Sequence, residues 1–320
     1  MNHLNLIYGT LDSMKLINTE VRIENTNACN ARCSICNHSK MTRNTETMSN
    51  TRFVHILNQI IPMGAETVSI FGFGEPLIDQ GIVWKVNYAR YRGLKTFITT
   101  NASLLYTQLG SELLGAGLSH LRFSVHGLFS KDYEQVHNGL SFIETIRNIF
   151  NFIIINRKRF DGRCKVSATV IPMAGESVDD IRRFWEPHVN WLEVWRPHNW
   201  ATAKSFRRVL AKEARLSTCG RPFRGPVQIQ SNGDVIPCCF LTDGEVVLGN
   251  VFKEKLEDIL VGDAYEKLRH AHASGELDDY PCKSCDQLNI EEESPLLYSN
   301  RDKNMKIGCT SSTKFCVTCE

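Results

Sequence analysis

The stretch NACNARCSICN, residues 27–37, contains three cysteines, Cys29, Cys33 and Cys36, in the spacing C-x3-C-x2-C. Protein metal sites are usually completed by four ligands, and no fourth cysteine lies nearby. The preceding residues, VRIEN at 21–25, have the composition of a short strand. The pattern therefore predicts a metal centre with one free coordination position, at the end of a strand.

The composition is that of an ordinary globular protein. Of the 320 residues, 42% are hydrophobic and 22% charged, and the net charge is only +2. We therefore expect no nucleic-acid partner, and the short basic run 157–159 reads as a solvated helix end. The first ten residues do not form a signal peptide, and no apolar run approaches a membrane span, so we expect a cytoplasmic protein without membrane association. Twelve cysteines in a reducing compartment favour metal binding or chemistry over disulfides.

Strand and helix patterns alternate through the first two-thirds of the chain. Strands are predicted at 21–25, 67–72, 95–100, 120–125, 164–171 and 191–195. Helices are predicted at 49–62, through 82–88, and at 103–115, 141–159 and 177–186. Six such repeats imply a parallel sheet, and they are too few for an eight-stranded barrel. We predict an α/β fold, a partial (β/α)6 TIM-type barrel with its functional groups beyond the strand carboxyl ends.

The remaining chain suggests further segments. We expect an N-terminal extension at 1–18, the barrel at 19–198, a connection at 199–218, a small α+β domain at 219–290, and a loosely ordered tail containing cysteines at 291–320. The small domain combines short strands in 227–230, 234–239 and 245–250 with one helix at 254–273. The pairs Asn232-Gly233 and Asp243-Gly244 suit tight hairpin turns, because both tolerate positive φ.

Thiolates are the usual ligands of iron–sulfur clusters. A cubane held by three cysteines keeps one iron open, and that iron can bind the amino and carboxyl groups of a small molecule. The alternative is zinc with His38 as the fourth ligand, but C-x3-C-x2-C-x-H is cramped for a tetrahedral site.

Three further stretches, FGFGEPL (71–77), TTNAS (99–103) and FSVHG (123–127), follow the cysteine loop in order. Together with that loop they resemble the radical S-adenosylmethionine (SAM) enzymes. In this resemblance Glu75 meets the methionine amino group, Ser124 the ribose and Ile35 the adenine. Phe73 stands where many members have a second glycine, and His126 replaces a commoner aspartate. The cofactor-binding residues that the resemblance implies are Ile35, Gly72, Gly74, Glu75, Pro76, Asn101, Ser124 and His126.

The resemblance also implies the chemistry. One electron from a reduced [4Fe–4S] cluster, supplied by a reductant such as flavodoxin or ferredoxin, cleaves SAM, and the resulting 5′-deoxyadenosyl radical takes hydrogen from a substrate C–H bond. The protein contributes orientation, redox tuning and exclusion of side reactions.

A second group of cysteines, Cys219, Cys238, Cys282 and Cys285, lies in the small domain. From the residues alone, four thiolates suit a structural zinc or an iron–sulfur cluster equally. The sequence around them resembles the auxiliary-cluster "twitch" region, the short form of the SPASM extension, which implies one auxiliary [4Fe–4S] cluster. The ligand order is most similar to that of 2-deoxy-scyllo-inosamine dehydrogenase, an aminocyclitol-oxidising member.

Five cysteines remain. Cys239, beside a cluster ligand, is either a hydrogen-atom donor or a packed apolar residue, and we favour packing. Cys164 is predicted to pack in a strand. Cys309, Cys316 and Cys319 are expected to be free thiols, with a third cluster as the alternative. After the last barrel strand, Arg196 and His198 are candidates for a catalytic base or a substrate hydrogen bond, with a capping or solvated role as the alternative.

The resemblance thus implies oxidation or epimerisation of a sugar or aminocyclitol-type small molecule, and the ligand order gives a slight preference for oxidation. One alternative is radical modification of a ribosomally made peptide, although no peptide-binding module is evident before residue 19. Another is a non-catalytic electron-transfer protein. The oligomeric state is left open.

Overall fold

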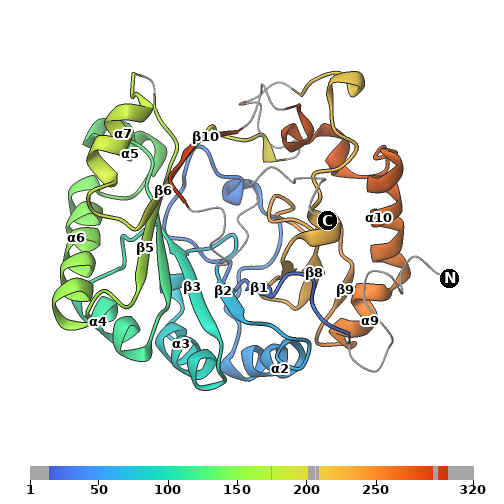
Figure 1. Cartoon of the computed structure of the whole chain (residues 1–320), viewed down its shortest axis with the longest axis horizontal. Helices are drawn as coiled ribbons and strands as arrows, with labels where there is room; N and C mark the ends of the chain where they lie inside the picture. The colour runs from blue at the N-terminus through green and yellow to red at the C-terminus, as the bar shows by residue number, and fades with distance from the viewer. Residues whose placement is uncertain (1–13, 174, 201–205, 207–208, 291–294, 302–320) are drawn as a thin grey trace.

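The structure is a computed structural model. It describes residues 14–173, 175–200, 206, 209–290 and 295–301. Six parallel strands lie side by side in chain order and curve into an open barrel (Figure 1). They are β1 (Glu20–Ile23), β2 (Thr67–Ile70), β3 (Lys95–Thr100), β4 (His120–Ser124), β5 (Lys165–Val170) and β6 (Trp191–Trp195). The predicted partial barrel is confirmed, with each strand bound within two residues of its prediction.

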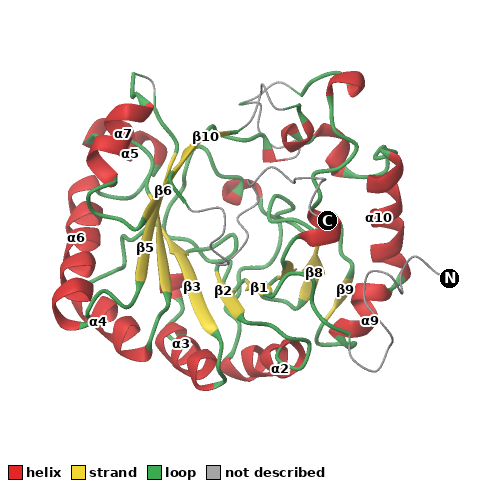
Figure 2. Cartoon of the chain, in the orientation of Figure 1, coloured by secondary structure: helices red, strands yellow, loops and turns green. Residues whose placement is uncertain are grey.

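Helices cover the outside of the sheet (Figures 1 and 2). They are α2 (Asn50–Ile60), α3 (Ile82–Tyr91), α4 (Thr107–Ala116), α5 (Ser130–Val136), α6 (Phe142–Arg159) and α7 (Val178–Trp185). Ser49, Ser141 and Ser177 cap three of them by accepting a hydrogen bond from the backbone N–H three residues on. The sequence analysis did not predict α5, which has only seven residues.

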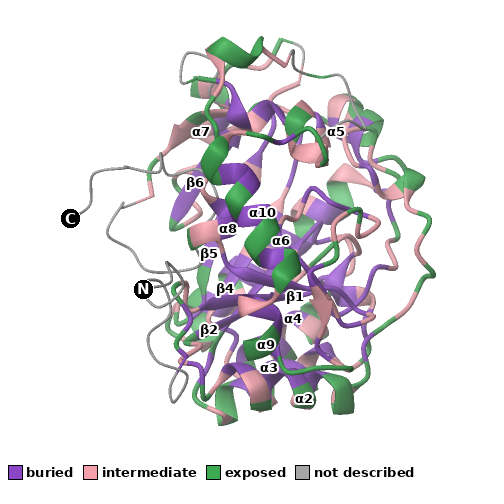
Figure 3. Ribbon diagram, turned by 90° about the vertical axis from the view of Figure 1, so that its right-hand side faces the viewer, coloured by how far each residue is buried: buried purple, intermediate pink, exposed green. Residues whose placement is uncertain are grey.

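The main core lies between the sheet and these helices. Alternate strand residues such as Val21, Ile23, Val68 and Ile98 are fully buried there. They meet one stripe of each helix, for example Phe53 of α2, which has no exposed surface. Figure 3 shows the buried strands inside and the exposed helix faces outside.

The small domain continues the same sheet. Strand β7 (Val227–Ile229) pairs parallel to β1 and antiparallel to β8 (Asp234–Ile236), which pairs with β9 (Gly249–Asn250). The Asn232-Gly233 hairpin is confirmed, with Gly233 at φ +92°. The tight hairpin at Asp243-Gly244 is wrong, because that pair lies within the longer connection between β8 and β9.

The single helix predicted at 254–273 is also wrong. Two helices, α9 (Leu256–Val261) and α10 (Asp263–Ser274), meet at Gly262, which is extended at φ −72° and ψ 159°. A short helix, α8 (Arg221–Arg224), precedes β7. The 3₁₀ turns are His38–Lys40, Pro76–Ile78, Lys212–Ala214, Pro281–Ser284 and Asp286–Leu288.

The tail is more ordered than predicted. Strand β10 (Leu296–Ser299) pairs antiparallel with β6 and closes that edge of the sheet. The loose tail expected over 291–320 is therefore wrong at these residues, because edge pairing supplies order that the local sequence pattern does not reveal. Among the described residues, no helix has the length and apolarity needed to cross a bilayer.

Candidate functional site

The cysteine loop follows β1 and lies against the end of α5. Cys29, Cys33 and Cys36 are all half-buried. Two backbone hydrogen bonds flank Cys33: Arg32 N–H donates to Asn138 O, and Ser34 N–H donates to Val136 O, both at 2.9 Å. Burial raises the pKa of Cys29 to about 11 and that of Cys33 to about 12, so a bound metal must displace their protons.

The Gly-Glu-Pro segment touches this loop through its backbone. Glu75 N–H donates to Ala28 O at 2.8 Å. A Cβ on Gly74 would lie 2.4 Å from Ala28 O and 2.5 Å from Thr26 O, so only glycine fits. Gly72 is similarly close to the Glu24 side chain, with 2.3 Å to its Cγ. Because these two glycines have no side chain, the Gly-Glu-Pro segment can contact the start of the cysteine loop, about 45 residues earlier in the sequence.

Glu75 is buried and accepts three hydrogen bonds. Thr100 Oγ1 donates to Oε1 at 2.6 Å, Asn101 N–H to Oε2 at 2.8 Å, and Leu77 N–H to Oε1 at 3.1 Å. Burial raises the pKa of this carboxyl to about 7. Asn101 in turn donates to Asn30 Oδ1 at 3.1 Å, which ties β3 to the cysteine loop. The carboxyl thus organises the ends of β2 and β3 beside the thiols.

At the end of β4, Ser124 Oγ lies 3.2 Å from His126 Nε2, and Ile171 N–H donates to His126 Nδ1 at 3.1 Å. The backbone N–H of His126 donates to Nε2 of His137, whose Nδ1 lies 3.4 Å from Cys33 Sγ. Burial lowers the pKa of both histidines, that of His137 to about 4. The sequence analysis missed His137, which lies 104 residues from Cys33.

The inner face of the barrel is polar. Its strand residues alternate with the apolar ones of the helix-facing side. Ser69 donates to Glu20 Oε1 at 2.6 Å, and His120 Nε2 lies 2.7 Å from Ser167 Oγ. The inward polar residues of β1–β6 include Glu20, Arg22, Ser69, Thr99, His120, Arg122, Ser167, Thr169 and Glu193.

Solvent exposure on this inner face increases towards the carboxyl ends of the strands. His120 and Ser167 are buried, whereas Arg122 and Thr169, two residues further along, are half-buried. Five atoms here find no hydrogen-bond partner among the described residues: Glu20 Oε2, Thr99 Oγ1, His120 Nδ1, Thr169 Oγ1 and Trp191 Nε1. A buried polar atom left unpaired costs about 1–3 kcal/mol, so this face is suited to a polar ligand.

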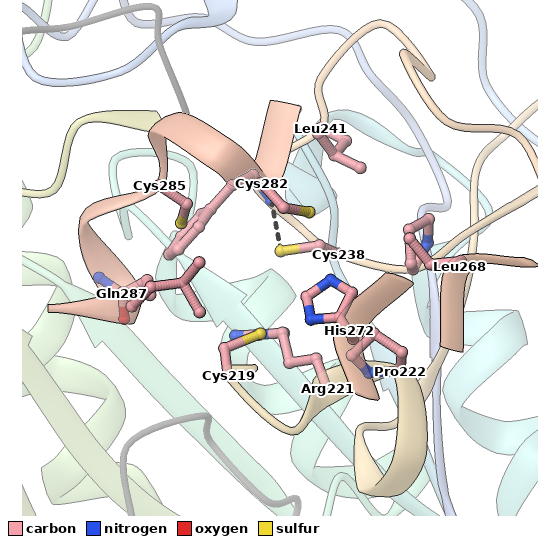
Figure 4. Close-up of a pocket in the computed structure, with 13 residues that line it drawn as sticks. Cys219, Arg221, Pro222, Cys238, Leu241, Leu268, His272, Cys282, Cys285 and Gln287 are labelled. Carbon is pink, nitrogen blue, oxygen red and sulfur yellow. Dashed lines mark hydrogen bonds between the residues drawn. The ribbon is translucent and has the colours of Figure 1, made fainter. Parts of the chain in front are cut away.

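The second thiol group surrounds one cavity in the small domain (Figure 4). Its lining includes Cys219, Cys238, Cys282 and Cys285, with apolar residues such as Leu268 between them. Phe240 N–H points at Cys238 Sγ from 3.5 Å. Among the described residues, no three His, Cys, Asp or Glu side chains lie close enough together to hold one metal ion. The four thiols line the wall of the cavity.

Arg221 also lines this cavity, and the sequence analysis missed it. Its side chain is only 6% exposed, and its Nη1 has no hydrogen-bond partner among the described residues. The nearby sulfurs of Cys239, Cys238, Cys219 and Cys285 raise the pKa of the guanidinium although burial opposes this. A fixed positive charge therefore faces the four thiols, where it favours thiolates.

Cys239 does not line the cavity, unlike its neighbour Cys238. The pKa of Cys239 is lowered, first by a hydrogen bond from the Cys238 thiol and then by the charges of Arg221 and Arg22. Because Arg22 belongs to the barrel interior, Cys239 lies within electrostatic reach of both sites.

The two candidate residues after β6, Arg196 and His198, lie in different surroundings. Arg196 is exposed, and its backbone N–H donates to Pro295 O at 2.6 Å. His198 is half-buried, with its ring 4.2 Å from that of Phe240. Trp200 Nε1 donates to the Ile35 carbonyl at 2.7 Å, which links this segment to the cysteine loop. The structure thus brings His198, but not the Arg196 side chain, towards the two thiol groups.

Glu24, at the end of β1, joins the two halves of the molecule, and sequence reasoning missed it. Its carboxylate pairs with Arg43 through two hydrogen bonds of 2.8 and 3.0 Å. It also accepts from Ser231 Oγ at 2.9 Å and from Phe73 N–H at 3.0 Å. Because Glu24 is buried and the Arg43 side chain is only 9% exposed, removing either partner would leave a poorly solvated, uncompensated charge.

Three further predictions concern residues outside the two thiol groups. His38, the candidate fourth zinc ligand, instead places Nε2 2.7 Å from the backbone carbonyl of Asn27. Cys164 is 1% exposed within the core, as expected for packing. Cys309, Cys316 and Cys319 lie outside the described residues.

Comparison with known proteins connects these features. A family model of the radical SAM superfamily matches residues 23–185, just over half of the chain, and a model of an iron–sulfur cluster-binding domain, SPASM, matches residues 219–286. GTP 3′,8-cyclase of Alkaliphilus metalliredigens is 27% identical over 169 residues, or 51% of this chain and 50% of that protein. PqqA peptide cyclase of Bradyrhizobium diazoefficiens is 31% identical over 109 residues, or 34% and 28%. The chain thus matches about half the length of these relatives, or less.

Solved structures share the fold. BtrN in complex with AdoMet and 2-DOIA has a TM-score of 0.58 at 16% identity, covering 87% of this chain and 95% of that one. SuiB of Streptococcus suis bound to precursor peptide SuiA has a TM-score of 0.65 at 19% identity, covering 87% and 72%.

The radical SAM family implies a [4Fe–4S] cluster that binds SAM, and the SPASM domain implies the binding of auxiliary iron–sulfur clusters. The residues present fit both groups. Three half-buried thiols share one loop beside the Gly74 contact, and four thiols share one cavity with a buried cation. Since the superfamily model matches just over half of the chain, this protein belongs to the radical SAM enzymes.

Proposed function

We propose that this enzyme abstracts hydrogen from a C–H bond of a polar small molecule of the sugar or aminocyclitol type and oxidises or epimerises it. The polar inner face of the barrel carries this proposal. Hydroxyl-rich ligands need convergent donors and acceptors, and Thr99 and Thr169, which are half-buried towards the strand carboxyl ends, each present an unpaired hydroxyl there. Arg122 and Glu193 add one charge of each sign.

In this proposal Cys29, Cys33 and Cys36 hold the SAM-binding cluster, and Cys219, Cys238, Cys282 and Cys285 hold one auxiliary cluster. The bound cluster supplies the one-electron reductive cleavage of SAM. The backbone of residues 72–76 and the side chains of Asn101, Ser124 and His126 orient the cofactor. Glu75 acts largely through its neighbours, because its oxygens already accept three internal hydrogen bonds.

Peptide modification is the second candidate. SuiB has a similar fold and was solved with a precursor peptide, and the matched part of PqqA peptide cyclase is 31% identical. A peptide substrate requires an extended groove, whereas the inner face of the barrel holds several polar atoms that have no partner among the described residues. That polar interior favours the small molecule.

Cys239 distinguishes oxidation from epimerisation. In oxidation the substrate radical would lose a proton and pass its second electron to the auxiliary cluster held by the four thiols of the small domain. No hydrogen then returns to the substrate carbon, and Cys239→Ser keeps most of the turnover. In epimerisation a thiol returns a hydrogen atom to the opposite face, and that thiol exchanges its proton with solvent.

The test is turnover in D₂O of candidate sugars and aminocyclitols, followed by mass spectrometry of the product. We expect dehydrogenated product without deuterium on the reacting carbon. Deuterium at an inverted carbon that disappears in Cys239→Ser would replace oxidation by epimerisation. Cleavage of SAM that is stimulated only by peptides would contradict the small-molecule proposal.

A further inference from the structure

His137 lies directly opposite Cys33 and is held there by the backbone. The hydrogen bonds Arg32 N–H to Asn138 O and Ser34 N–H to Val136 O flank the pair on both sides. His137 N–H also donates to Tyr133 O at 2.7 Å, at the end of α5. The 3.4 Å separation between His137 Nδ1 and Cys33 Sγ is therefore fixed by main-chain pairing.

The hydrogen-bond pattern assigns the ring proton. His137 Nε2 accepts the backbone N–H of His126 at 3.1 Å, so Nε2 carries no proton. An imidazole ring always keeps at least one N–H, so the proton is on Nδ1. Nδ1–H therefore points at the Cys33 sulfur as a donor.

The ring cannot turn easily. It stacks on Tyr133 with ring centroids 4.4 Å apart and on His126 at 5.0 Å. Its exposed fraction is 2%. His126 is fixed in turn, because Ile171 N–H donates to its Nδ1. The result is a continuous chain of groups from the end of β5 to the cysteine loop.

We propose that His137 is a positioning residue that donates an N–H···S hydrogen bond to the cluster ligand Cys33 and thereby raises the reduction potential of the SAM-binding cluster. This inference rests on the proposed role of Cys33. Hydrogen bonds to cluster sulfurs stabilise the reduced, more negative state. The same bond orients the thiolate within its loop.

Two substitutions of His137 test its two hydrogen bonds one at a time. His137→Asn keeps an amide donor at the position of Nδ1 and loses the acceptor for His126. His137→Gln places an acceptor at the position of Nε2 and loses the donor to Cys33. His55→Gln, at an exposed position on α2, serves as the matched control.

The measurement is an EPR-monitored redox titration of reconstituted protein, following the reduced-cluster signal that changes when SAM is added. We expect the midpoint potential of His137→Gln to move to more negative values, while His137→Asn and His55→Gln stay at the wild-type value. Iron content and SAM cleavage are measured on each sample. Full iron content and SAM cleavage with an unchanged potential in His137→Gln would overturn this inference alone.

A second measurement needs no variant. Wild-type protein labelled with ¹⁵N-histidine should show a histidine nitrogen coupled to the reduced SAM-binding cluster in pulsed EPR. Absence of that coupling in fully loaded protein overturns the inference even if the variants fold poorly. A wild-type protein that binds no iron and cleaves no SAM overturns the proposed function, and the inference with it.

Discussion

The two thiol sites of this molecule are built in opposite ways. The first takes three cysteines from one eight-residue segment, 29–36, beside a buried carboxyl and a neutral histidine. The second gathers four cysteines from three segments, around 219, 238 and 282–285, with a buried arginine among them. A local loop can lose its metal and stay folded, whereas a site assembled from separate segments depends on its metal for cohesion.

The largest expected effect is at the first site. Replacing Cys29, Cys33 and Cys36 together by Ala should abolish formation of 5′-deoxyadenosine under strong reductant. The iron content should fall from about eight to about four per chain. Iron analysis and chromatography of the reaction mixture measure both. A wild-type protein with one zinc and no iron would end this assignment, and about twelve irons would indicate a third cluster.

The second prediction concerns how far the metal at the second site stabilises the fold. Cys282→Ala with Cys285→Ala should remove the auxiliary iron and lower the Tm by several degrees more than the triple substitution does. Among the described residues, the apolar cluster beside that cavity has three buried members, Ala271, Leu277 and Leu288, so apolar packing contributes little to holding the segment. Scanning calorimetry of anaerobic samples measures the difference. Equal losses of Tm at the two sites would show that the second site does not depend on its metal more than the first.

The sequence predicted the barrel well because each strand and helix signals itself locally. Alternating burial in 95–100 and the apolar stripe of 49–62 are periodic patterns within one element. The cysteines and the Gly-Glu-Pro segment were also recognisable as short motifs. By contrast, β10 owes its order to pairing with β6, about 100 residues away, and no local pattern announces it.

Most of the electrostatic environment could not be predicted. His137 contacts Cys33 although the two residues are 104 positions apart in the sequence, and Glu24 accepts a hydrogen bond from Ser231, 207 positions away. A lone histidine or arginine between motifs carries no spacing signal. The polar inner face was not predicted, although the sequence signals it: in 67–71 and 165–169 polar or aromatic residues alternate with apolar ones.

The third prediction uses the carboxyl that distinguishes the first site. The pKa of Glu75 is about 7 in the fold and about 4.5 in the unfolded chain, so the folded state binds more protons between these values. Its contribution to stability is present below pH 4.5 and is lost as the pH rises through 7, by about 3 kcal/mol. Glu75→Gln should remove this loss.

The measurement is denaturant unfolding of metal-free protein at pH 5 and pH 8. The lowered pKa values of His126 and His137 act in the opposite direction, since stability rises as these groups lose their protons. The difference between wild type and Glu75→Gln isolates the carboxyl. Parallel stability curves for the two proteins would show that Glu75 keeps an ordinary pKa.

The smallest expected effect tests whether the first site depends on one close backbone approach. Gly74→Ala would place a methyl group against two carbonyl oxygens, at 2.4 Å and 2.5 Å, and neither can retract without moving the cysteine loop. We expect a loss of about 1–3 kcal/mol in the free energy of unfolding, with slower SAM cleavage because Cys29 follows Ala28 directly. Gly115→Ala is the matched control, since an added Cβ there meets no atom within 4 Å on an exposed turn of α4. That change should stabilise the protein by about 0.5–1 kcal/mol, because alanine is the better helix former. If Gly74→Ala matched the wild type in both stability and SAM cleavage, the contact between residues 72–76 and the cysteine loop would not position the first site.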